Sequence, residues 1–261
     1  MNLKDAKIAI IGAGNVATRL ALEFNRLELN IVQVFSRTQR SALELASKLG
    51  TTCTTEIKNI TPNADIYFIC VPDKFIEPLC AKLQLGNKLL IHTAGSVDMN
   101  VLKVASSEYG VFYPMQTFSK FKESDLNQVP IFIEGSSQQS EEMLYEIGKM
   151  LSHKIYSINS EQRQYVHLAA VFACNFSNHM YGIAEDILKK NGIPFEILKP
   201  IIKETSEKIQ KFQPRESQTG PAVREDMEIL EKHEILLGNT PKYLEMYSLI
   251  SKSIIDLKAK P

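Results

Sequence analysis

A glycine-rich turn offers the clearest chemistry in this sequence. Residues 12–17 read Gly-Ala-Gly-Asn-Val-Ala and match the spacing G-x-G-x-x-[GA]. In that spacing the first glycine permits a tight turn, the second lets backbone approach a diphosphate, and a small last residue lets helix pack on strand. An apolar run precedes the turn and a helical apolar stripe follows it. Because a helix start offers unpaired N–H groups to an anion, the segment predicts a dinucleotide site rather than a ligand-free turn. The predicted contacts here are Gly12, Gly14, Asn15 and Val16.

A basic, hydroxyl-rich segment follows the second predicted strand and indicates which dinucleotide binds. An NAD site places an acidic residue about 20 positions after the glycines, but here the chain reads Phe35-Ser36-Arg37-Thr38-Gln39-Arg40. Hydroxyls and guanidinium groups are suited to a 2′-phosphate through charge-assisted hydrogen bonds. We therefore predict NADP(H) rather than NAD(H), held by Ser36, Arg37, Thr38 and Arg40. The alternative is that both arginines are solvated residues at a helix start.

Three further segments lie where predicted strands end, which is where ligands bind in open α/β sheets. They are Val71-Pro72-Asp73, His92-Thr93-Ala94-Gly95-Ser96, and residues 113–118, Tyr-Pro-Met-Gln-Thr-Phe. The first is expected to border the nicotinamide ribose and the second to lie beside the ring; the Tyr-Pro bond of the third is a candidate for the cis form. For each segment a simple strand-ending turn is the alternative. The predicted cofactor contacts are Val71, Pro72, Thr93, Ala94 and Gly95, and the predicted catalytic residues are Ser96 and Gln116.

Polar side chains on the long predicted helix of residues 160–192 supply the remaining catalytic candidates. His167 and Asn178 lie about 20° apart in helical phase, and Asn175 and His179 are i, i+4 neighbours. A buried amide or imidazole needs a partner, which a substrate could provide. His167 and Asn175 are therefore predicted catalytic residues, with a satisfied core hydrogen bond as the alternative.

A second turn, Thr219-Gly220-Pro221, opens a later predicted helix that carries Arg224 and Asp226. Their position after the turn makes them candidates for a substrate or cofactor clamp. The alternative is a surface ion pair of little energetic value.

The elements that must position these residues change character near residue 157. Before it, apolar strand-like runs alternate with helical patterns, which predicts a mostly parallel sheet with helices on both faces. After it we expect helices and no strand. We thus predict an α/β domain over residues 1–157 and an all-helical domain over 158–261. Strands are expected at 7–11, 31–35, 65–72, 88–92, 110–118, 129–136 and 154–158. Helices are expected after the glycine turn and at 41–50, 75–83, 143–151, 160–192 (capped by Ser160), 194–212 (broken or kinked by Pro200), 222–238 and 241–260.

Composition argues against several classes of function, although a local charged patch stays possible. Of the 261 residues, 44% are hydrophobic and 23% charged, and 30 basic residues balance 30 acidic ones. No overall field attracts nucleic acid or an anionic membrane. Because the first predicted strand begins near Lys7, we expect no signal sequence, and because the apolar runs are short we expect no segment that crosses a bilayer. Four scattered cysteines predict reduced core thiols in a cytoplasmic protein, without disulfide or metal site.

Seven motifs in order resemble a little-characterised group of NADP-dependent oxidoreductases: IGAGNVA, FSRT, CVPD, HTAGS, YPMQTF, AAVFACNF and TGPAVREDMEILEKH. The resemblance covers nearly the whole chain and implies a doubly wound, Rossmann-like α/β domain followed by a helical domain of unknown function. The group is similar to pyrroline-5-carboxylate reductase, ketopantoate reductase, 6-phosphogluconate dehydrogenase and deazaflavin-dependent NADP reductases. In those relatives the helical domain supplies substrate contacts and a dimer interface.

By this resemblance an interdomain site would include Asn175, Thr219, Gly220, Pro221, Arg224, Asp226 and His233. Two positions depart from the group, which often has histidine at Tyr113 and glycine at Glu225. No lysine stands near Asn175, so the lysine–asparagine pair of hydroxyacid dehydrogenases is not visible in the sequence.

The leading hypothesis is an NADP(H)-dependent oxidoreductase acting on a small carbonyl or imine between the two domains, in a homodimer formed through the helical domain. Asn175, with Ser96 or Gln116, would hold the substrate, and His167 would exchange a proton near neutral pH. The alternative is a catalytically silent NADP sensor. The substrate, the direction of the reaction and a deazaflavin partner stay open.

Overall fold

The computed structural model describes residues 3–118 and 125–258. By the density of internal contacts the chain divides into two units, Met1–Asn175 and Phe176–Pro261. The first unit is built on an eight-stranded sheet of order β3-β2-β1-β4-β5-β6-β7-β8. All neighbouring strands are parallel except β6 and β7, which pair antiparallel. The strands are β1 (Lys7–Ile11), β2 (Asn30–Phe35), β3 (Thr52–Thr54), β4 (Ile66–Ile69), β5 (Gly86–His92), β6 (Ser106–Pro114), β7 (Ile131–Gly135) and β8 (Ile155–Ser157).

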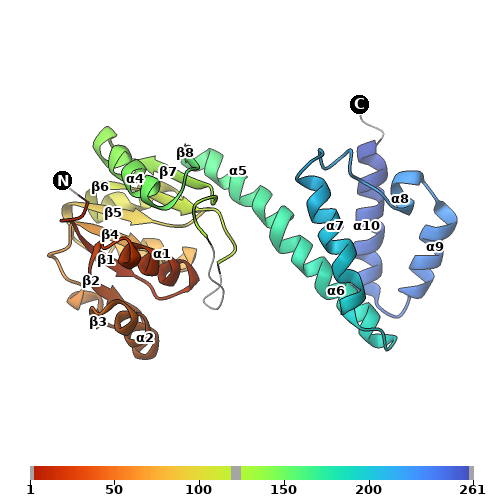
Figure 1. Ribbon diagram of the computed structural model, residues 1–261, viewed down its shortest axis with the longest axis horizontal. Helices are drawn as coiled ribbons and strands as arrows, with labels where there is room; N and C mark the ends of the chain where they lie inside the picture. The colour runs from red at the N-terminus through yellow and green to blue at the C-terminus, as the bar shows by residue number, and fades with distance from the viewer. Residues whose placement is uncertain (1–2, 119–124, 259–261) are drawn as a thin grey trace. The chain divides into compact units, whose positions relative to one another are not determined.

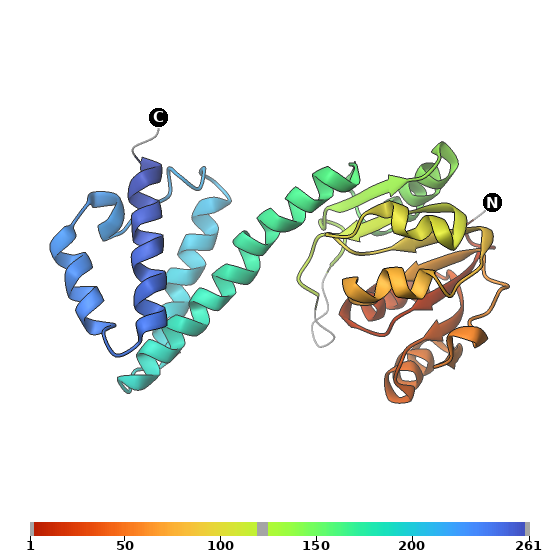
Figure 2. The ribbon, with the colours of Figure 1, turned by 180° about the vertical axis from the view of Figure 1, so that it is seen from behind.

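Helices cover both faces of this sheet (Figures 1 and 2). Helices α1 (Asn15–Arg26), α2 (Gln39–Leu49) and α4 (Gln138–Leu151) pack on one face, whereas α3 (Ile76–Cys80) and the 3-10 segment η3 (Met99–Val104) pack on the other. Each face of the sheet has its own core: the first core lies under α1, α2 and α4, and the second under α3 and η3. In β1, Ile8 and Ile10 enter the first core and Ala9 and Ile11 the second, so the strand must be apolar throughout. The predicted α/β class with a mostly parallel sheet is confirmed.

Some predicted elements of the first unit differ in detail. Strand β3 was not predicted, because Thr52–Thr54 is short and polar. The expected helix at 75–83 is instead the 3-10 segment η2 (Asp73–Phe75) followed by the five residues of α3. The described peptide bonds include no cis bond, so the bond between Tyr113 and Pro114 is trans and the candidate cis form is wrong.

The predicted long helix is present but not uniform. Residues 160–190 are helical throughout, as α5 (Ser160–Ala170), the π-helical segment η4 (Val171–Phe176) and α6 (Ser177–Lys190). The cap is Asn159 and not Ser160, because the Asn159 side chain accepts the Gln162 N–H and the Gln162 side chain accepts that of Asn159. The wider turn of η4 also shifts the phase of everything beyond it, so the predicted alignment of His167 with Asn178 is wrong.

Beyond residue 157 the described part of the chain contains no strand, as predicted. The elements after α6 are η5 (Phe195–Leu198), α7 (Lys199–Ile209), α8 (Pro221–Arg224), α9 (Met227–Leu236) and α10 (Pro241–Lys258). The predicted break at Pro200 is confirmed, since α7 begins beside it and proline is tolerated in the first turn of a helix. The single helix expected at 222–238 is wrong: Glu225 takes a left-handed φ of 57° between α8 and α9. Of the last predicted helix, residues 259–260 lie outside the described residues.

The cysteines are free, but they are not all core thiols. Cys70 and Cys80 are buried, Cys53 is half-buried and Cys174 in η4 is exposed. Burial raises the pKa of the Cys70 thiol to about 12 and that of Cys80 to about 11, so both stay protonated at neutral pH. The prediction of a buried thiol at Cys174 is therefore wrong.

Candidate functional site

The glycine turn joins β1 to α1, and its two glycines are required for different reasons. Gly12 has a φ of +128° and donates its N–H to the Phe35 carbonyl at 2.7 Å; a Cβ there would lie 2.2 Å from the Cys70 carbonyl oxygen. Gly14 is the N-cap of α1, has open space around it, and carries no side chain that could satisfy the first N–H groups of the helix. Close packing therefore selects the first glycine. The second leaves bare N–H donors facing outward, which fits an anionic diphosphate.

The other two predicted residues of this turn have structural contacts of their own. Asn15 opens α1 and donates its side-chain N–H to the Phe118 carbonyl at 3.0 Å, so it ties the turn to the segment that follows β6. Val16 is half-buried against the first core cluster. Asn15 thus has a structural partner beside any role in binding.

The predicted 2′-phosphate residues follow β2. Ser36 is half-buried and donates its N–H to the Thr54 carbonyl at 3.2 Å, whereas Arg37, Thr38 and Arg40 are exposed. Thr38 is the N-cap of α2 but makes no side-chain capping bond. The Arg37 guanidinium lies over the Phe75 ring, 4.1 Å from its centroid. These hydroxyl and guanidinium groups are available to a phosphate.

The loop after β5 is held by backbone and imidazole contacts. The N–H of Thr93 donates to the Ile69 carbonyl at 3.2 Å, and that of Ala94 donates to Nδ1 of His92 at 3.2 Å. His92 is fully buried, and burial lowers the pKa of its imidazole to about 3, with a smaller effect of the Arg163 charge. The neutral ring therefore fixes the loop at every physiological pH. Beyond it, the Ser96 hydroxyl donates to the Asp73 carboxylate, which follows Val71 and Pro72 at the end of β4.

A buried arginine anchors the start of α5 under the same loop. Arg163 is 1% exposed, pairs with the Glu134 carboxylate of β7 and donates to the Val97 carbonyl of the loop. Ser160 donates its hydroxyl to Glu134 at 2.8 Å, and also accepts the Met99 N–H at 3.0 Å. Because Arg163 is buried and both side chains of the pair make further hydrogen bonds, the pair fixes α5 against the ends of β5 and β7.

This anchoring brings His167 to the carboxyl ends of the strands. Its Nδ1 lies 3.1 Å from the Tyr113 hydroxyl, and a Cβ on Gly95 would meet the imidazole at 2.7 Å. Burial and the negative charge of Asp73 raise the pKa of the Tyr113 hydroxyl, while Arg163 acts in the opposite direction. Gly95, Ser96, Asp73, Tyr113 and His167 therefore form one polar cluster, the strand-end cluster, at the ends of β4, β5 and β6.

The other predicted catalytic residues have different surroundings. Gln116 is exposed, and its side-chain oxygen accepts the N–H of Thr117 at 2.8 Å. Asn175 is exposed on η4, so it is not the buried amide that was expected on the long helix. In the helical unit Arg224 is exposed at the end of α8, and Asp226 caps α9 by accepting the Ile229 N–H at 3.4 Å. Asp226 therefore has a local structural function.

In the helical unit the TGP motif borders an apolar hollow, and His233 contacts one of the residues that line it. Thr219, Gly220 and Pro221 line an apolar hollow of about 300 Å³. Tyr247, from α10, lines the same hollow. Its hydroxyl lies 2.8 Å from Nδ1 of His233.

Sequence reasoning missed the residues that hold the strand-end cluster together. Tyr113 stood in a recognised segment but without a role, and Arg163 and Glu134 were not singled out. The available signal was an arginine three residues after the start of a helix whose first turn was otherwise polar. No sequence rule pairs it with a glutamate on a distant strand, because that pairing is made by the sheet.

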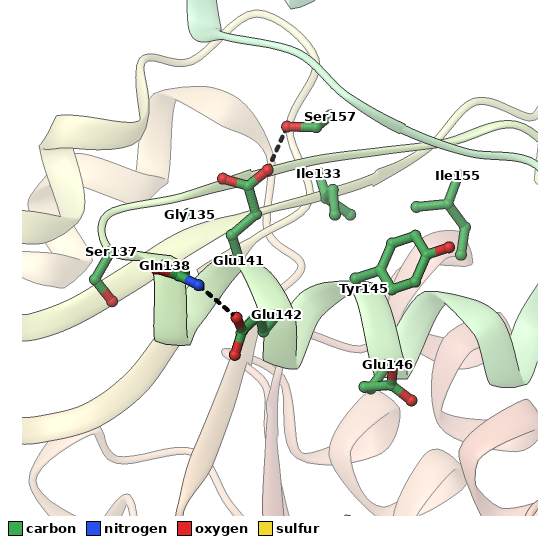
Figure 3. A pocket seen from close by; sticks show the side chains of 10 residues that line it. All are labelled: Ile133, Gly135, Ser137, Gln138, Glu141, Glu142, Tyr145, Glu146, Ile155 and Ser157. Atoms are coloured by element: carbon green, nitrogen blue, oxygen red, sulfur yellow. Dashed lines mark hydrogen bonds between the residues drawn. The ribbon is translucent and has the colours of Figure 1, made fainter.

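A larger hollow of about 700 Å³ lies elsewhere, where α4 passes β7 and β8 (Figure 3). Three carboxylates line it, and each has a partner: Glu141 accepts from the Ser157 hydroxyl, Glu142 from Gln138, and Glu146 pairs with Lys149. None of the predicted site residues lines this hollow. We assign it no function.

Comparison with known proteins follows this geometry. Residues 7–95 match the family described as NADP oxidoreductase, coenzyme F420-dependent, and residues 129–254 match a domain of unknown function, DUF2520. The chain is 43% identical to a Bacteroides fragilis protein of known crystal structure that is assigned as an NADP oxidoreductase, with 98% of this chain and 100% of that one covered and a TM-score of 0.92. The chain belongs to this NADP oxidoreductase family. The predicted family and its cofactor, NADP(H), are confirmed at that level.

More distant proteins with this fold include an enzyme solved with the cofactor. A reductive aminase from Aspergillus terreus in complex with NADPH and ethyl levulinate is 15% identical, with 96% of this chain and 94% of that one covered and a TM-score of 0.67. A pyrroline-5-carboxylate reductase from Coxiella burnetii is 14% identical, with 98% and 99% covered and a TM-score of 0.57. At these identities the likeness concerns the fold alone.

A glutamyl-tRNA reductase of Sulfurisphaera tokodaii is 30% identical over 99 residues, 34% of this chain. The match spans 24% of the length of that protein. Within residues 3–118 and 125–258, no helix has the length and apolar character to cross a membrane.

Proposed function

We propose that this family member uses NADPH to reduce a small carbonyl or imine at the strand-end cluster. The observation that carries the proposal is the 3.1 Å approach of the Tyr113 hydroxyl to Nδ1 of His167, beside the loop of Gly95 and Ser96. Ligands of open α/β sheets bind beyond the carboxyl ends of the strands, and this pair lies there.

The glycine turn and the segment after β2 are the proposed cofactor site. The uncapped start of α1 and the open space at Gly14 suit the diphosphate, and the exposed Arg37, Thr38 and Arg40 suit a 2′-phosphate. Val71, Pro72, Thr93 and Ala94 would border the nicotinamide end. Bound NADPH supplies the hydride.

The Tyr113–His167 pair is the proposed source of the proton. Because the pKa of Tyr113 is raised, its hydroxyl stays protonated at neutral pH and can donate to the substrate oxygen or nitrogen. His167, hydrogen-bonded to that hydroxyl, would return a proton to it. Ser96 would orient the substrate, and Asp73 would hold the Ser96 hydroxyl. Roles for Gln116, Asn175, Arg224 and Asp226 stay predictions.

The test is a screen of NADPH oxidation with small ketones, ketoacids and cyclic imines, followed by Tyr113→Phe and His167→Asn on whichever substrate is reduced. Each substitution is expected to lower kcat by about 10²-fold or more, as loss of a general acid does. Tyr145→Phe and His153→Asn change an exposed tyrosine and an exposed histidine away from the cluster and are expected to leave kcat unchanged. Full activity of both cluster variants would refute the proton-donor role.

The alternative, a catalytically silent NADP sensor, is decided by the same screen. Tight NADPH binding without turnover of any compound, and with none when a deazaflavin is supplied, would favour the sensor.

We also propose that the chain forms a homodimer through its helical unit. The support is the number of large apolar side chains that this unit leaves exposed, among them Ile201, Phe212, Ile235, Leu236 and Leu249. A second copy of the chain is the proposed cover.

A further inference from the structure

Phe75 and Arg37 meet although they lie far apart in sequence and on different strands. Arg37 follows β2 and Phe75 closes η2 after β4, and these two strands flank β1 in the sheet. The glycine turn leaves from the same end of β1. The contact between Arg37 and Phe75 therefore forms beside the proposed diphosphate site, within the first unit.

The contact has the geometry of a cation–π interaction. The Arg37 Cζ lies 4.1 Å from the centroid of the half-buried Phe75 ring. Arg37 itself is exposed, and among the described residues it makes no salt bridge with a carboxylate. The ring thus provides the contact that restrains a long side chain which would otherwise sample many rotamers.

Stacking on a ring leaves the donors of a guanidinium free. Its N–H groups lie in the plane of the group and point outward from its edge, while the ring contacts its face. A phosphate bound by two N–H groups needs that edge in a fixed orientation. A restrained Arg37 meets this need, whereas a mobile one would lose entropy on binding.

We infer that Phe75 is a specificity-determining residue, which selects NADP(H) over NAD(H) by holding the Arg37 guanidinium edge-on to the 2′-phosphate. The inference rests on the proposed cofactor site. It gives Phe75 a positioning role that acts through Arg37 and involves no direct contact with the 2′-phosphate.

The experiment measures binding of NADPH and NADH to the full chain by calorimetry, since the two ligands differ only in the 2′-phosphate. Phe75→Leu is expected to weaken NADPH binding about fivefold and to change NADH binding less than twofold. Phe75→Tyr keeps the ring and is expected to keep the wild-type ratio. If Phe75→Leu folds poorly, Phe75→Met removes the ring as well and gives the same comparison.

Two further comparisons test whether Phe75 acts through Arg37. In Arg37→Met, Phe75→Leu is expected to leave the NADPH-to-NADH ratio unchanged, because the residue it positions is gone. Lys74 also lies over the Phe75 ring, at 5.1 Å, so Lys74→Met is the matched control and is expected to change the ratio less than twofold.

Several results would overturn the inference. An equal loss of affinity for NADPH and NADH in Phe75→Leu would mean that the Phe75 ring stacks on the adenine instead. The same loss in the Arg37→Met background, or a Lys74→Met effect as large as that of Phe75→Leu, would exclude action through Arg37. If the wild-type protein shows no preference for NADPH, the proposed cofactor selectivity itself fails and the inference falls with it. A wild-type preference for NADPH that Phe75→Leu leaves unchanged refutes the inference alone.

Discussion

The two units of this chain bury their apolar side chains to very different degrees. In the first unit, strands and helices enclose two core clusters, and aromatic rings such as Phe24, Phe68 and Phe112 are completely buried. In the described part of the helical unit, the only hydrophobic residues that are buried are Ala222 and Leu230. Ile235 and Leu236 of α9 are 78% and 81% exposed.

This difference separates a fold with an enclosed core from one that leaves much apolar surface exposed, for which a second copy of the chain is the proposed cover. A sheet with helices on both faces buries apolar strands within one chain. The helices of the second unit leave many of their apolar side chains exposed, and an apolar surface of this kind is typical of an interface. The site chemistry follows the same division, since the strand-end cluster lies wholly in the first unit.

The largest expected effect tests the packing of the first unit at its glycine turn. Gly12→Ala should lower the free energy of unfolding by about 4 kcal/mol or more, because the methyl group meets the Cys70 carbonyl and φ is +128°. Gly14→Ala is the matched control: no atom lies within 4 Å of the new methyl group, so the free energy of unfolding should fall only by the loss of glycine at the N-cap of α1, about 1 kcal/mol or less. Urea unfolding measures both. NADPH should still bind more weakly to Gly14→Ala, because its methyl group faces the diphosphate site. Equal stability of the two variants would contradict this account.

The next effect tests the cover of the helical unit. The wild-type protein should have twice the 29.4 kDa chain mass in light scattering, and Leu236→Asp should reduce it to a single chain. An unpaired carboxylate buried in an interface costs about 3–5 kcal/mol. Leu43→Asp changes a side chain of the first unit that is 48% exposed and should leave the mass unchanged. A monomeric wild-type protein would refute the dimer.

A smaller effect concerns pH and the buried imidazole of the first unit. Folded His92 binds a proton only below about pH 3, whereas the unfolded chain binds one below about pH 6.5, so unfolding takes up a proton between these values. Stability should therefore fall as the pH falls, with a contribution of His92 of about 2 kcal/mol between pH 7 and pH 5. His92→Asn keeps an acceptor for the Ala94 N–H and should lose that part of the pH dependence. Urea unfolding at both pH values checks the difference, and equal slopes for both proteins would show that His92 titrates normally.

The smallest expected effect lies in the helical unit, at the break between α8 and α9. Glu225→Gly should raise the free energy of unfolding by about 0.5–1 kcal/mol, because glycine adopts the left-handed φ of 57° without strain. Arg224→Gly, one residue earlier and inside α8, should instead lower it by about 1 kcal/mol. Opposite signs in the same unfolding assay would confirm that backbone conformation is decisive, and a destabilised Glu225→Gly would argue for a side-chain role.

This position also shows how a departure from a family pattern is explained by structure. The glycine that the family resemblance implies at residue 225 would fit a left-handed backbone, and Glu225 adopts that conformation here at some cost. The sequence indicated an altered loop, but only the dihedral angle gives a physical reason for glycine at this position.

By itself, the sequence determined the α/β fold, the glycine turn, the basic segment after β2 and the family, because each depends on local periodicity or on residues close together in the chain. It also singled out His167 and Ser96. The sequence could not determine that Tyr113 meets His167, that Arg163 pairs with Glu134, or that Phe75 supports Arg37. Those contacts join residues from different elements, so they exist only after the sheet has set the order of its strands. The phase relation between His167 and Asn178 could not be predicted for a related reason: the π-helical segment between them changes the register of the helix, and no periodicity in the residues indicates it.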